Sequence, residues 1–128
     1  MTDRKKILDT FENPQGKDDY LITMDIPEFT CLCPLTGQPD FAEFVINYIP
    51  DKLCVELKSL KLYMASFRDE GAFHEDNTNT ILKDLVQLIK PRYISVIGYW
   101  KVRGGIATTI TTKHIKRNWK DSNRLLVD

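Results

Sequence analysis

Two amphipathic helical segments follow one another in the middle of the chain, with strand-like segments on both sides. The first apolar stripe, at the spacing i, i+3, i+4, i+7, consists of Leu60, Tyr63, Met64 and Phe67. The second stripe consists of Ile81, Leu85, Leu88 and Ile89. Gly71 is expected to follow the end of the first helix, Asp76 or Asn77 to cap the second, and Pro91 to stop it. The central part of the fold is therefore a pair of helices.

Segments rich in β-branched and aromatic residues surround these helices. Strands are expected at 20–26, 41–49, 53–58, 92–102 and 105–112. The last two join at Arg103-Gly104-Gly105, which predicts a hairpin. Residues 29–40 contain two prolines and a Thr36-Gly37 turn signal, so we predict a loop there. The order predicts an α+β fold, an antiparallel sheet with two helices on one face.

The length of 128 residues is that of one domain. We predict a flexible lead-in at 1–19, a single domain at 20–112 and a C-terminal tail at 113–128. One small sheet leaves its edges and its second face uncovered, and assembly of identical subunits would cover them. We therefore expect a homo-oligomer.

Charge and cysteine content narrow the class of protein. Eighteen basic residues balance eighteen acidic ones, so neither a nucleic acid nor a membrane surface is indicated as a partner. No apolar run approaches the roughly 20 residues of a membrane-spanning helix, and the first residues lack the apolar core of a signal peptide. Three cysteines, an odd number, fit a reducing cytoplasm better than a disulfide framework.

Cys31 and Cys33 are the cysteines with chemical interest, because Cys54 lies in an apolar segment typical of a core. A loop pair of cysteines can ligate a metal, but zinc usually takes four ligands, and His74 and His114 do not complete a set. The other interpretation is that Cys33 is a nucleophile. Asp40 follows seven residues later, and a turning loop would bring the two together as nucleophile and general acid.

Three further charged segments allow both a structural and a functional interpretation. Glu75 lies at a helix start, where an acid either complements the dipole or accepts N–H groups from a guanine-like ring edge. Lys58 and Lys61 are either solvated or contact phosphates, and Arg103 either belongs to a turn or clamps a phosphate. No G-x-G-x-x-G follows a strand, which excludes a Rossmann cofactor domain.

Three blocks of sequence resemble one known family. They are FTCLCPLTGQPDF at 29–41, VELKSLKLYMASFRDEGAFHED at 55–76 and RGGI at 103–106. They resemble the NADPH-dependent 7-cyano-7-deazaguanine reductases of queuosine biosynthesis, in their short single-module form. The resemblance implies the tunnelling fold (T-fold), whose subunits assemble into barrels with sites at their interfaces.

The resemblance also implies residue roles. Cys33 matches the nucleophile that forms a covalent thioimide with the nitrile, and Asp40 matches the acid that delivers protons. The residues that match substrate-binding positions are Val55, Glu56, Leu57, His74 and Glu75. The residues that match positions near NADPH are Lys58, Arg103 and Gly104. Leu57 stands where the motif often has serine, so any side-chain contact there is in question.

The implied reaction consumes two NADPH, needs neither a metal nor a flavin, and yields 7-aminomethyl-7-deazaguanine for tRNA modification. The implied partners are the nitrile substrate and further copies of the chain, for which two stacked pentamers are one possible assembly. The implied location is the cytoplasm. No direct contact with a nucleic acid or a membrane is expected. We expect Glu75 to reach a neighbour's site.

Three other functions remain open at this point. An amidinotransferase-like relative would add ammonia to the same nitrile in tRNA, but it has no use for the phosphate-binding candidates Lys58 and Arg103. A zinc-dependent cyclohydrolase on the same fold would need metal ligands that are missing here. A purine- or pterin-binding module would leave Cys33 inert.

Overall fold

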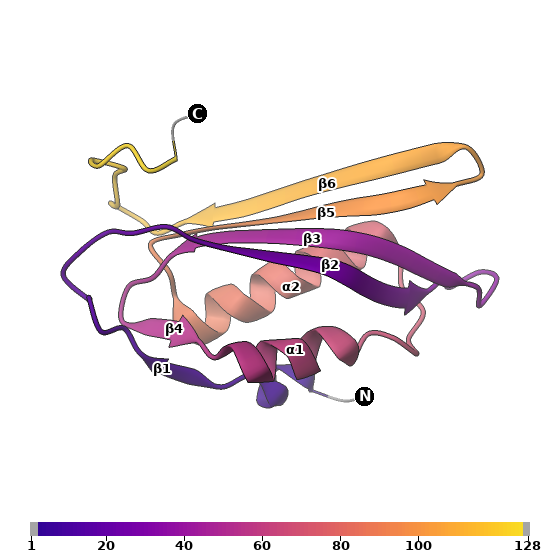
Figure 1. Ribbon diagram of the computed structural model, residues 1–128, viewed down its shortest axis with the longest axis horizontal. Helices are drawn as coiled ribbons and strands as arrows, with labels where there is room; N and C mark the ends of the chain where they lie inside the picture. The colour runs from indigo at the N-terminus through magenta and orange to yellow at the C-terminus, as the bar shows by residue number, and fades with distance from the viewer. Residues whose placement is uncertain (1–2, 127–128) are drawn as a thin grey trace.

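The computed structural model describes residues 3–126 (Figure 1). In chain order the elements are η1 (Arg4–Ile7), β1 (Thr10–Glu12), β2 (Ile22–Leu32), β3 (Pro39–Ile49), β4 (Leu53–Val55), α1 (Leu57–Ala65), α2 (His74–Ile89), β5 (Tyr93–Arg103) and β6 (Ile106–Ile115). The four long strands form an antiparallel sheet in the order β2-β3-β5-β6, and β1 pairs with β4. Both helices lie on the same face of the large sheet. The predicted α+β architecture is confirmed.

The core lies between this sheet and the helices, and it follows the two periodicities of the sequence. Alternate residues of β3 point toward the helices, and Phe44 and Ile46 are fully buried there. The stripes of α1 and α2 meet them, with Tyr63 and Ile81 also fully buried. Each such side chain contributes about 1.5–3 kcal/mol by its removal from water. These contacts hold both helices against the sheet.

The predicted loop at 29–40 is too long. β2 continues to Leu32 and β3 begins at Pro39, so the connection is only 33–38. Phe29 and Cys31 extend the alternation into the core, and Cys31 pairs with Asp40 across the two strands. The prolines misled the prediction because Pro39 begins a strand, where no ladder N–H is required.

The predicted boundaries near the helices also differ from the structure. The strand expected at 53–58 ends at Val55, because Glu56 caps α1. The first helix ends at Ala65, and Gly71 instead forms a parallel bridge with Leu32. The second helix begins at His74, and no side chain caps it, so the predicted caps are wrong.

The segments predicted as lead-in and tail contain defined structure. In the lead-in, β1 pairs with β4, and Leu8 is buried. In the tail, β6 runs to Ile115, and Trp119 Nε1 donates a hydrogen bond of 3.2 Å to Asp19. Residues 1–2 and 127–128 of these two segments lie outside the described residues. Ordered elements therefore extend past both limits of the predicted 20–112 domain.

The β5–β6 hairpin is confirmed at the expected place. Its connection is the pair Gly104-Gly105, with φ of 59° and 82°. Two consecutive left-handed residues match the right-handed twist of the strands, and glycine adopts this conformation without strain. The turn therefore fixes where the strand residue Arg103 lies, at the end of β5.

Gly98 gives a test of the packing beneath the sheet. A Cβ at this position would lie 2.8 Å from Trp100 Nε1 and 3.0 Å from the Phe44 ring. Gly98→Ala should therefore lower the free energy of unfolding by about 1–3 kcal/mol, as overpacking does. Urea denaturation measures the change. Gly16→Ala is the control, because its Cβ would have no contact closer than 3.8 Å. Equal stability of the two variants would contradict the packing.

Candidate active site

The connection between β2 and β3 is a compact turn that carries Cys33. The Cys33 N–H donates to the Gln38 carbonyl at 2.8 Å, and the Gly37 N–H donates to the Cys33 carbonyl at 2.9 Å. Gly37 has a φ of 72°, which favours glycine. Asp40 follows at the start of β3. The turn thus brings Cys33 and Asp40 to the same end of one hairpin, as the sequence predicted.

The two cysteines of this hairpin differ in chemical state. Hydrogen bonds from the Thr36 side chain and from the backbone of Leu35 and Thr36 lower the pKa of Cys33, which is partly exposed. Burial, helped by the charge of Asp40, raises the pKa of Cys31 to about 11. The thiolate is the nucleophilic form of cysteine. Of these two thiols, Cys33 is therefore the one whose surroundings favour the thiolate, and Cys31 is a core residue.

Asp40 is a buried carboxylate whose two oxygens both have partners. Its side chain is 7% exposed. Oδ1 accepts a hydrogen bond from Arg103, and Oδ2 lies 3.2 Å from His74 Nε2. A buried charge is tolerated when it is paired in this way. The cluster joins three segments that are far apart in the sequence.

His74 is held firmly in this cluster. Its ring stacks on the indole of Trp100, with centroids 3.9 Å apart and planes at 3°. Trp100 is itself buried, and its Nε1 donates to Thr78 Oγ1 at 3.3 Å. The Thr78 hydroxyl in turn donates to the His74 carbonyl at 2.8 Å. The imidazole therefore has a fixed position beside Asp40.

The segment between the helices brings His74 to the sheet. The Leu32 N–H donates to the Glu70 carbonyl at 3.0 Å, and the Ala72 N–H donates to the Leu32 carbonyl at 3.2 Å. This segment lies along the end of β2, so α2 starts beside the Cys33 turn. Glu75 is exposed in the first turn of α2, next to His74. It therefore lies at the Cys33 end of its own chain, and its reach into a neighbour's site stays a prediction.

Arg103 and Gly104 border a shallow cavity at the same end of the molecule. Its volume is about 550 Å³, and it is lined by the residues Gln38, Pro39, Asp40, Phe41, Lys101, Val102, Arg103 and Gly104. Arg103 also donates to the Pro39 carbonyl at 3.0 Å. Two cationic side chains on this surface suit an anionic ligand.

The remaining candidates, Val55 to Lys58, lie at the opposite end of the fold. In Figure 1, β4 and the start of α1 are at the left, and the β2–β3 and β5–β6 turns are at the right. Val55 is buried, and the Glu56 carboxylate accepts the N–H groups of Lys58 and Ser59 at 2.7 and 2.8 Å. These N–H groups lower the pKa of Glu56. One chain therefore does not bring this segment to Cys33.

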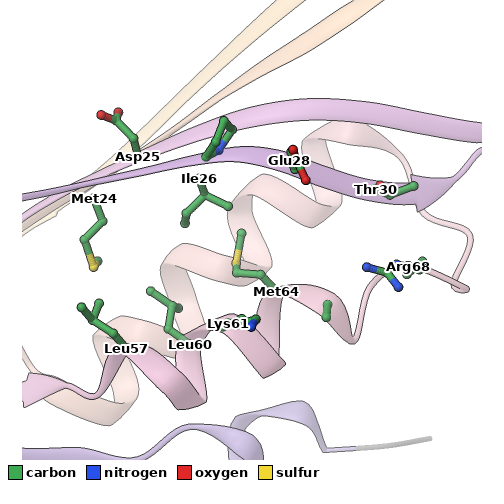
Figure 2. A pocket seen from close by; sticks show the side chains of 12 residues that line it. Met24, Asp25, Ile26, Glu28, Thr30, Leu57, Leu60, Lys61, Met64 and Arg68 are labelled. Atoms are coloured by element: carbon green, nitrogen blue, oxygen red, sulfur yellow. The ribbon is translucent and has the colours of Figure 1, made fainter.

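A second hollow runs between β2 and α1, with a volume of about 450 Å³. Figure 2 shows Met24 and Ile26 of β2 facing Leu57, Leu60 and Met64 of α1 across it. Its lining contains neither Cys33 nor Asp40. The hollow opens along an edge strand of the sheet and is separate from the Cys33 turn.

Thr36 and Trp100 shape the site and were not predicted from the sequence. The hydroxyl of Thr36 could have been noticed, because it lies three residues after Cys33 in a tight turn. Trp100 gives no such signal, since its contact with His74 depends on how β5 and α2 pack. Within residues 3–126, no three His, Cys, Asp or Glu side chains group as a metal site would require. No helix in that range has the length and apolar character to cross a bilayer.

Known proteins resemble this chain in sequence and in fold. The profile of the family described as QueF-like protein matches residues 39–119. The NADPH-dependent 7-cyano-7-deazaguanine reductase of Nitrosomonas europaea is 57% identical over 99% of this chain and 91% of its own. Proteins of the same name from Acidithiobacillus ferrooxidans and Magnetococcus marinus are 58% and 59% identical, over 92% and 88% of this chain and 84% and 88% of their own. The crystal structure of the archaeosine synthase QueF-Like in the apo form matches with a TM-score of 0.68 over 73% of this chain and 91% of its own, at 19% identity, which concerns the fold alone.

The difference between the two thiols predicts their reactivity. Iodoacetamide should label Cys33 with a midpoint below the pH of about 8.5 at which an ordinary thiol ionises, while Cys31 stays unlabelled. Thr36→Val removes the hydroxyl that stabilises the thiolate, so the midpoint should move to higher pH. Peptide mass spectrometry across a pH series measures both sites.

Thr111→Val, on an exposed position of β6, is the control and should leave the midpoint unchanged. Faster labelling of Cys31 than of Cys33, or an unchanged midpoint in Thr36→Val, would contradict this account.

Proposed function

The chain belongs to the family of NADPH-dependent 7-cyano-7-deazaguanine reductases of queuosine biosynthesis, and we propose that it reduces the nitrile through a covalent thioimide on Cys33. The observation that carries the proposal is that Cys33, partly exposed and with a lowered pKa, and the buried Asp40 lie at the same end of one hairpin. Asp40 acts as the acid and base. The product is 7-aminomethyl-7-deazaguanine.

The first step is addition of the Cys33 thiol across the nitrile. The sulfur–carbon bond forms as one carbon–nitrogen π bond breaks, and the thiol proton passes through Asp40 to the nitrogen. The lowered pKa of Cys33 supports this step, because the thiolate attacks. A thioimide accepts hydride more readily than a nitrile does. NADPH supplies two hydrides, one before and one after Cys33 is released.

His74 and Glu75 are our candidates for holding the substrate. The exposed carboxylate of Glu75 can accept two N–H groups from the edge of the deazaguanine ring. The fixed imidazole of the preceding residue, His74, lies beside Asp40. Substrate would thus be gripped at its ring edge while its nitrile faces Cys33.

The residues proposed for the rest of the site require a second chain. Val55, Glu56 and Leu57 as substrate contacts and Lys58 as a cofactor contact lie at the far end from Cys33. We propose that this segment of one subunit faces the Cys33 end of its neighbour in a homo-oligomer, where Arg103 and Gly104 complete the NADPH site. Apolar side chains exposed at both ends support assembly, with Leu57 64% and Val102 67% exposed. Glu56 would contribute backbone, since its carboxylate caps α1.

The proposed function predicts two measurements on the native chain and on Cys33→Ala. The native chain mixed with 7-cyano-7-deazaguanine alone should gain the full mass of the nitrile, and the variant should gain none. With NADPH present, the native chain should oxidise two NADPH per nitrile, and the variant should lose turnover entirely because no covalent intermediate forms. Intact mass and absorbance at 340 nm report these results.

A control variant and three contrary results distinguish this proposal from its alternatives. Cys54→Ala is the matched control and should keep both properties, because Cys54 is buried away from the turn. An adduct without NADPH oxidation would favour the amidinotransferase-like alternative. An inert Cys33 would favour a binding module. An adduct that persists in Cys33→Ala would refute the assigned nucleophile.

The two-chain site predicts complementation between inactive variants. Cys33→Ala damages one half of the proposed site, and Lys58→Glu reverses a charge in the other half. Oligomers of either variant alone should have little activity. Co-expressed mixed oligomers should recover a clear fraction of native turnover, because some interfaces then contain two intact halves. A mixture no more active than its components, or an active monomer in sedimentation, would show that one chain holds the whole site.

A further inference from the structure

Both oxygens of the Asp40 carboxylate are occupied in the free chain, although the proposed reaction needs one of them. Arg103 donates to Oδ1, and His74 lies at Oδ2. With its side chain 7% exposed, Asp40 has little access to water. A general acid or base must place an oxygen within hydrogen-bond reach of the proton that it moves. Each carboxylate oxygen can accept more than one hydrogen bond, so neither contact forbids this step, but release of either partner would open an oxygen to the moving proton.

His74 is the partner less able to leave. Its ring is stacked on buried Trp100 at 3.9 Å, and its backbone carbonyl accepts the hydroxyl of fully buried Thr78. It is also the first residue of a helix of 16 residues. Moving the imidazole would break the packing between α2 and β5, so this contact is part of the fold.

Arg103 is the partner that can move. Its side chain is 34% exposed, it is the last residue of β5, and the turn residues Gly104-Gly105 follow it. The pairing register of β5 and β6 shifts between Trp100 and Arg103, which uncouples the hairpin end from the regular ladder. Its remaining contacts are the exposed Gln38 side chain and the Pro39 carbonyl.

The surface around Arg103 offers an alternative partner for the guanidinium. The cavity of about 550 Å³ beside it also includes Lys101, so it presents two cations. A phosphate group accepts a bidentate pair from arginine as well as a carboxylate does. Arg103 can therefore exchange the Asp40 carboxylate for the phosphate of a bound nucleotide.

We propose that Arg103 is a latch that occupies Asp40 until the phosphate of NADPH draws it away, so that cofactor binding frees Asp40 to move the proton for thioimide formation. The inference rests on the proposed function and deepens it. Arg103 is a positioning residue in the covalent step, which consumes no reductant: the thiol proton ends on the nitrile nitrogen as the sulfur–carbon bond forms.

The test measures the rate of adduct formation with saturating NADP⁺, which carries the phosphates but no hydride. In the native chain NADP⁺ should accelerate the adduct by about fivefold or more, the lower end of couplings between two sites. In Arg103→Gln the rate without nucleotide should already match the native rate with NADP⁺, and nucleotide should add nothing. Arg117→Gln, on the exposed segment after β6, removes the same charge elsewhere and should behave as native.

If nucleotide binding weakens the contact between Arg103 and Asp40, then loss of that contact must strengthen nucleotide binding by the same factor. This gives a second measurement, which does not depend on adduct formation. Asp40→Asn weakens the ion pair, so Arg103 should be free, and NADP⁺ should bind about fivefold more tightly than to the native chain by titration calorimetry. The latch is refuted if native adduct formation is indifferent to NADP⁺, if Arg103→Gln is slower without nucleotide, or if Asp40→Asn does not tighten NADP⁺ binding. A native chain that forms no adduct at all would instead refute the thioimide, while the titration would still test the latch.

Discussion

A buried carboxylate at the start of β3 is the constraint on which this structure depends. Asp40 is removed from water, and an unpaired buried charge would cost several kcal/mol. Its two partners come from the start of α2 and from the end of β5. To supply them, the segment after α1 must lie against the end of β2, and the β5–β6 hairpin must end beside the Cys33 turn. Three distant parts of the chain are thereby gathered at one end of the sheet.

The same end separates the two neighbouring thiols by their environments. Cys31 faces the core, where desolvation keeps it protonated, and Cys33 lies in a turn whose donors favour the thiolate. The end of the strand produces this contrast: β2 continues through Cys31 to Leu32 and stops before Cys33. Residues two apart in a strand share one face, so a β2 that continued past Leu32 would direct Cys33 to the same face as Cys31.

The fold also has two chemically different ends. The Cys33 end carries the acid, the imidazole and the guanidinium, and the far end carries the start of α1 with the exposed cation Lys58. A rigid sheet keeps these ends apart within one chain. In the homo-oligomer that we propose, subunit assembly would bring them together and would also cover the open sheet edges β2 and β6. The enclosure of a reactive imine would then follow from the interface.

The sequence alone determined the helical stripes, the hairpin at Gly104-Gly105, the α+β class and the placement of Cys33 and Asp40 on either side of one turn, because these depend on local spacing and turn chemistry. Only the tertiary structure decided where β2 ends, that Glu56 caps α1, that α2 starts at His74, that Trp100 stacks on His74 and that Arg103 contacts Asp40. Such features depend on which distant side chains share a buried charge or a packed face. Contacts of that kind follow from how the elements pack, and no local pattern of residues specifies them.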